Sequence, residues 1–137
     1  MREIKFRVWL EDKDIPEGYM VDGADNLLIT TRNGSLVIEN SQGKINHYKE
    51  NQYILLQYTG LKDKNGKEIY EGDIFDCIYN FDGCKKHKLQ VYWNDVSAGF
   101  FLKDIGECHQ PNVRKTLGDM ERMEIIGNIY ENSKLLK

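Results

Sequence analysis

The stretch that decides the fold is residues 56–74, which read LQYTGLKDKNGKEIYEGDI. Its glycines, Gly60, Gly66 and Gly72, follow one another at intervals of six residues. Asn65-Gly66 suits a two-residue hairpin turn. Glu71-Gly72-Asp73 stands before an apolar run and suits a tight turn, with Gly72 at positive φ and Asp73 capping backbone amides. These residues therefore predict a set of chain reversals that specifies structure and needs no ligand.

Short strand-like runs flank this stretch on both sides, separated by glycine-, asparagine- and aspartate-rich turns. Asn33-Gly34 is the clearest hairpin signal, whereas the segment around Pro16 and Gly18 predicts a loop. No window of eleven or more residues carries a helical stripe, although residues 135–136 suit a short final turn of helix. We expect strands at residues 5–10, 27–31, 35–39, 44–48, 53–58, 69–70, 74–79, 88–93, 99–102 and 123–130.

These strands recur at the spacing typical of a small barrel or sandwich. The pattern predicts a mainly β chain, with an SH3-like small barrel in residues 51–137 and an N-terminal β segment in residues 1–50. A shift in composition at residues 49–52 marks the expected boundary.

Composition narrows the classes of function. The chain of 137 residues has 19 Lys and Arg against 22 Asp and Glu, a net charge of -3, which disfavours an extensive nucleic-acid surface. It has no apolar run long enough to span a membrane and no leader-like start, so we expect no membrane association and a location inside the cell. Three cysteines cannot all pair, which predicts reduced thiols.

Residues 56–74 resemble the signature of the YopX family, small proteins of phages and prophages. The run IKFRVW at residues 4–9 is similar to the opening strand of that family, and EIIGNIYEN at residues 124–132 to its closing strand. The resemblance implies an SH3-like barrel with extra β structure at the N-terminus and a place in the cytoplasm of a bacterial host. It implies no reaction, no catalytic residue and no cofactor.

The spacing of the Cys and His residues gives little support to a metal site or to a catalytic site. Cys77, Cys84, His87, Cys108 and His109 have a gap of six residues between the first two cysteines, too wide for a zinc knuckle. No residue pattern positions a nucleophile beside a base. The acidic residues of 68–76 are typical of a solvated, turn-forming edge. We therefore predict no metal site and no enzyme.

Two kinds of interaction remain. Aromatic residues make up 11% of the chain, and interfaces favour Tyr and Trp; Trp9, Tyr48 and Tyr53 lie near the expected boundary and form a candidate interface for a protein partner or a second copy. The same side chains could instead pack the two β segments together.

The alternative is a small nucleic-acid-binding barrel. The basic run Lys85, Lys86 and Lys88 has Trp93 nearby, which would suit binding of a single strand through phosphates and stacked bases. The sequence thus predicts a non-catalytic protein-interaction module that self-associates, with nucleic-acid binding as the alternative.

Overall fold

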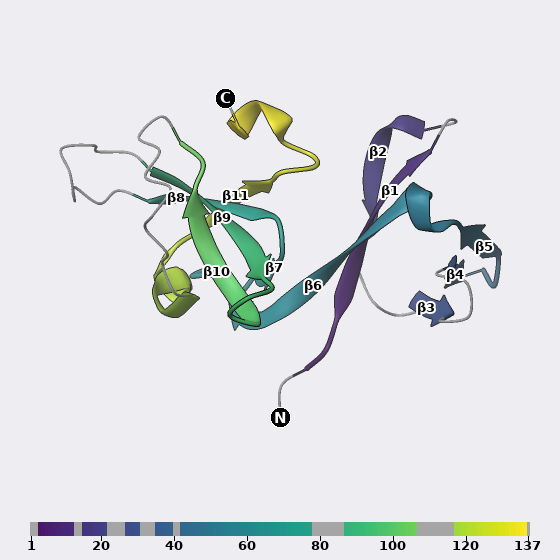
Figure 1. The fold of residues 1–137 in the computed structure, drawn as a ribbon, viewed down its shortest axis with the longest axis horizontal. Helices are drawn as coiled ribbons and strands as arrows, with labels where there is room; N and C mark the ends of the chain where they lie inside the picture. The colour runs from purple at the N-terminus through teal and green to yellow at the C-terminus, as the bar shows by residue number, and fades with distance from the viewer. Residues whose placement is uncertain are drawn as a thin grey trace. The chain divides into compact units, whose positions relative to one another are not determined.

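The computed structural model of the protein describes residues 3–12, 15–21, 27–30, 35–39, 42–77, 87–106 and 117–136. Within them the chain is mainly β and contains three short 3-10 helices and no α-helix (Figure 1). The predicted mainly β class with a small barrel-like sheet is confirmed. No helix in this part of the chain is long and apolar enough to cross a membrane.

The strands in chain order are β1 (Phe6–Asp12), β2 (Ile15–Val21), β3 (Leu27–Thr30), β4 (Ser35–Glu39), β5 (Ile45–Tyr48), β6 (Tyr53–Lys62), β7 (Glu68–Tyr70), β8 (Asp73–Cys77), β9 (His87–Asn94), β10 (Gly99–Asp104) and β11 (Ile125–Asn128). The 3-10 helices are η2 (Glu50–Gln52), η3 (Leu117–Arg122) and η4 (Ser133–Leu136).

The chain divides into two compact units. One is Lys5–Gln57, and the other is Met1–Ile4 with Tyr58–Lys137. The division lies inside β6, whose first half pairs with β1 and whose second half pairs with β7. The boundary predicted from the change in composition lies earlier in the chain, between residues 50 and 51.

The first unit contains the three-stranded sheet β3-β4-β5 and the pairing of β1 with β2 and β6. Val8, Leu10 and Leu36 are buried at its core. The loop predicted around Pro16 and Gly18 is wrong, because this segment is β2 and pairs with β1.

Tertiary packing explains β2. Pro16 is tolerated because β2 is an outer strand of its sheet. Gly18 has φ +69°, and a Cβ built on it would lie 2.2 Å from Cζ2 of Trp9. The strand therefore needs glycine there because the Trp9 ring packs directly on its backbone.

The second unit is built on the antiparallel sheet β10-β9-β8-β11, which curls over its core (Figure 1). The residues at the centre of this core are all buried: Ile69, Phe75, Leu89, Val91, Leu102 and Met120. Met120 comes from η3, so that 3-10 helix covers one side of the core.

The glycines of the deciding stretch all have positive φ: Gly60 at 88°, Gly66 at 80° and Gly72 at 88°. Two details of the prediction are wrong. The strand does not end at Gly60, because β6 continues through it with an irregular register. The chain also does not reverse at Asn65-Gly66 alone, since Asp63 and Lys67 close a three-residue loop with only Gly66 in the left-handed region.

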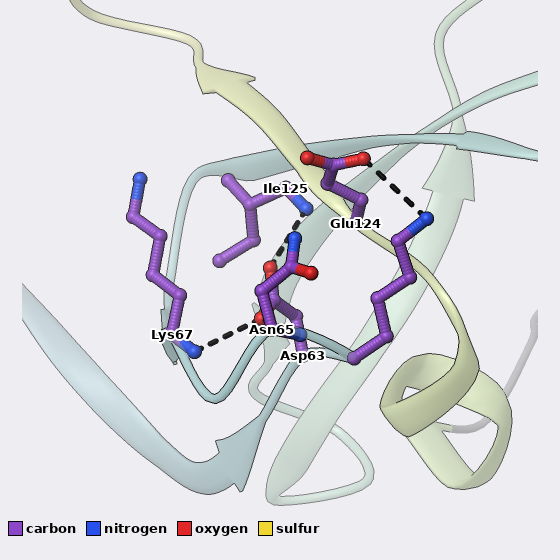
Figure 2. Close-up of polar contacts among 6 residues, drawn as sticks. Asp63, Asn65, Lys67, Glu124 and Ile125 are labelled. Atoms are coloured by element: carbon purple, nitrogen blue, oxygen red, sulfur yellow. Dashed lines mark hydrogen bonds and ion pairs between the residues drawn. The ribbon is translucent and has the colours of Figure 1, made fainter.

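Asp63 explains that loop. Its Oδ1 accepts hydrogen bonds from the backbone N–H groups of Asn65 and Lys67, both at 2.9 Å. Its Oδ2 accepts another from the N–H of Ile125 at 3.1 Å, which ties the loop to β11 (Figure 2). The Asp63 side chain therefore both shapes the β6–β7 turn and fastens it to the last strand.

Candidate interaction surface

The hairpin of β9 and β10 carries apolar side chains at its exposed end. Trp93 and Phe100 are cross-strand partners whose rings meet edge to face at 5.1 Å. Trp93 is 39% exposed, and Val96 in the connecting turn is 93% exposed. The N–H of Ser97 donates to Oδ1 of Asn94 at 2.9 Å, which supports the turn. We call Trp93, Val96 and Phe100 the apolar tip.

The opposite face of the same hairpin has a different character. Tyr92 and Phe101 are cross-strand partners with ring centroids 6.4 Å apart. The ammonium of Lys103 lies 5.4 Å from the centroid of the Tyr92 ring. Lys88 lies on this face too, because it is an even number of residues before Tyr92 on β9. We call Lys88, Tyr92, Phe101 and Lys103 the aromatic–lysine face.

The predicted nucleic-acid residues do not gather into one site in the described structure. Lys85 and Lys86 lie outside the described residues. Lys88 and Trp93 are five residues apart on β9, so their side chains project from opposite faces of the sheet. Lys88 is also the cross-strand partner of Asp76 on β8, and the carboxylate of Asp76 offsets its positive charge. The two-residue period of a strand could have shown from the sequence that Lys88 and Trp93 lie on opposite faces. A hairpin pairing of β9 with β10 could have added Phe101 and Lys103 to the candidate residues.

The predicted interface residues lie in the first unit and contribute to its packing. Trp9 is 6% exposed and covers Gly18. Tyr48 and Tyr53 are partly buried against the cluster that contains Val8. The hydroxyls of Tyr19 and Tyr48 also lie 3.4 Å apart. Each of the three predicted aromatics therefore has a packing role, and Trp9 has little surface left for a partner.

The predicted turn residues Gly72 and Asp73 connect strands of the second unit. Oδ2 of Asp73 accepts from the N–H of Tyr70 at 2.8 Å. The N–H of Gly72 donates to the carbonyl of Val91, and its carbonyl accepts from the N–H of Ile129. The turn is therefore hydrogen-bonded both to β9 and to the segment after β11. These backbone contacts explain why Gly72 and Asp73 occur there.

A histidine and an aspartate are paired in the interior of the second unit. Nδ1 of His87 and Oδ2 of Asp104 are 2.5 Å apart, and each residue is 5% exposed. Oδ1 of Asp104 accepts from the N–H of Gly106 at 2.9 Å. The pair links the start of β9 to the end of β10 inside the protein.

The other Cys and His residues whose spacing was weighed for a metal site are not described around this pair. Cys84, Cys108 and His109 lie outside the described residues, as does the side chain of Cys77, whose backbone pairs with His87. Within the described ranges no three His, Cys, Asp or Glu residues are grouped to hold a metal ion.

Comparison with known proteins gives a family and a solved structure. A family model described as "YopX protein" matches residues 5–137. A crystal structure of protein EF1440 from Enterococcus faecalis is similar, with 25% identity, a TM-score of 0.61 and full coverage of both chains. A search of curated proteins found no match.

Proposed function

Because the chain belongs to the YopX protein family, we propose that it is a non-catalytic protein-interaction module that self-associates through its apolar tip. The tip is the observation that carries the proposal. Trp93 and Val96 expose apolar surface to water, since Trp93 is 39% exposed and Val96 is 93% exposed. On this proposal the protein is of phage or prophage origin and works in the cytoplasm of a bacterial host.

Two physical features support binding at this tip. Tryptophan is among the residues that most often dominate the binding energy of interfaces. Trp93 is also preorganised, since β9 pairs with β10 from Asn94–Gly99 to Leu89–Asp104 and Phe100 supports its ring. A side chain already held in place loses little conformational entropy on binding, which favours association.

The test is the mass of the protein in solution over a concentration series, measured by sedimentation or light scattering. Val96→Asp places a charge in the tip at a position with almost no packing to lose, so it should shift the protein to monomer. Ile45→Asp is the matched control, because Ile45 is 53% exposed and lies in the other unit. A monomeric mass at high concentration, or equal association of Val96→Asp and the unmodified protein, would refute the proposal.

A further inference from the structure

We propose that the aromatic–lysine face of the β9–β10 hairpin is a binding site for single-stranded nucleic acid. This site is distinct from the apolar tip, because its residues alternate with Trp93 and Phe100 along the two strands. The proposal rests on the rings and cations of this face and does not depend on self-association.

The two rings form a platform on a rigid support. Tyr92 and Phe101 are paired across neighbouring strands, partly exposed, and tilted by 43° to each other. Aromatic side chains on a sheet surface bind unpaired bases by stacking, typically with one base to a ring. The pair therefore offers room for about two stacked bases. Bases in a duplex are already stacked and paired, so the platform selects single strands.

The charge of this face suits a phosphate backbone. Lys103 stands beside the Tyr92 ring, and Lys88 lies about 13 Å away from Tyr92 along β9. The acidic residue of the two strands, Asp104, is buried on the opposite face with His87. Asp76 of the neighbouring strand β8 is the cross-strand partner of Lys88 and offsets its charge, so Lys103 supplies most of the positive charge beside the rings on this face of a chain whose net charge is -3.

The chemistry favours nucleic acid over an acidic peptide as the ligand. Lysine alone would attract either polyanion, but two adjacent rings add affinity only where the ligand has flat faces to stack. Binding should then depend both on the rings and on salt, since each phosphate contacted releases counterions.

The experiment measures fluorescence anisotropy of a labelled oligothymidylate across a salt series. With two lysines in contact, the logarithm of the binding constant should fall with the logarithm of salt concentration at a slope of about -1.4. Tyr92→Leu and Phe101→Leu keep apolar bulk on the strands and should each weaken binding about 5- to 150-fold. Lys103→Gln should reduce the slope by about 0.7.

Matched controls separate this site from other surfaces. Val96→Asp changes the apolar tip and should leave binding of the oligonucleotide unchanged. Lys44→Gln removes an exposed lysine from the other unit and should leave the salt slope unchanged. Thermal unfolding of each variant confirms that it folds.

Three results would overturn the proposal. The first is the absence of salt-dependent binding to the single strand. The second is binding that persists in the folded Tyr92→Leu/Phe101→Leu double variant. The third is equal affinity for a duplex of the same sequence or for poly-glutamate, because either would show that the rings do not select unpaired bases.

Discussion

Replacing Asp63 with asparagine should destabilise the protein through one identifiable hydrogen bond. In the structure, Oδ1 of Asp63 accepts hydrogen bonds from the backbone N–H groups of Asn65 and Lys67, and Oδ2 accepts one from the N–H of Ile125 (Figure 2). An asparagine can keep the Oδ1 contacts. Its amide nitrogen then takes the place of Oδ2 and faces the N–H of Ile125, so two donors oppose each other.

The expected loss follows from the type of bond. A hydrogen bond to a charged group contributes roughly 1.5–3 kcal/mol, and Ile125 is only partly buried, so we expect about 2 kcal/mol for Asp63→Asn. For a chain of this size that corresponds to a fall in Tm of roughly 8 °C. Asp63→Ala removes all three acceptor contacts and should lose about 3 kcal/mol, because water can reach the amides in the turn.

The loss of stability caused by Asp63→Asn should also depend on pH. Burial raises the pKa of Asp63, but the donated N–H groups of Ile125, Lys67 and Asn65, with the charge of Lys67, outweigh it and hold the pKa below its ordinary value. An unfolded aspartate has a pKa of about 3.9. The stabilisation by Asp63 is therefore fully present above about pH 5 and is lost as the pH falls below 3.9 through the folded-state pKa.

Urea denaturation of the two proteins at pH 7 and near pH 3 tests this reasoning. The advantage of the unmodified protein over Asp63→Asn should be smaller at the lower pH, because the carboxylate begins to take up its proton there. Asp95→Asn, at an exposed aspartate in the β9–β10 turn, is the control and should have little effect at either pH. Equal stability at pH 7, or an advantage that does not change with pH, would refute the role assigned to the carboxylate.

Two further substitutions test packing and burial. Gly18→Ala should destabilise the protein by about 3 kcal/mol in urea denaturation, because it adds a strained φ and displaces the Trp9 ring. Gly43→Ala, at φ +78°, should lose only about 1 kcal/mol, because its added Cβ would meet only Oε1 of Glu39, at an ordinary contact distance of 4.0 Å; equal losses would contradict the ring contact. His87→Ala should lower the free energy of unfolding by about 3–5 kcal/mol, because it leaves Asp104 buried without this partner. The double variant His87→Ala/Asp104→Ala should lose less than the sum of the two single losses. Simple additivity in a double-mutant cycle measured by thermal unfolding would contradict a coupled pair.

Local signals were sufficient for most strands but not for those that depend on distant contacts. Alternation and turn residues predict β4, β5 and β9 closely, whereas the strand expected at residues 123–130 is reduced to β11 at Ile125–Asn128. They fail at β2, because Pro16 and Gly18 look like a loop until β1 and the Trp9 ring are in place. They fail also at the Asn65-Gly66 turn, where Asp63 and a strand 62 residues away set the geometry.

The candidate surfaces were only partly predictable, for a similar reason. The abundance of Tyr and Trp led to the prediction of an interface at Trp9, Tyr48 and Tyr53, but Trp9 is buried and the two tyrosines are partly buried in their own unit. Proximity in sequence also grouped Lys88 with Trp93, although the strand period separates them. Phe101 and Lys103 required the β9–β10 register, which no single strand contains.

The outer position of β2 has a consequence for aggregation. An exposed strand edge offers amides and carbonyls to which further strands can add without limit. Pro16 removes one of those amides, and the positive φ of Gly18 interrupts the regular extended backbone. The edge of β2 is therefore a poor template for the addition of further strands into fibrils.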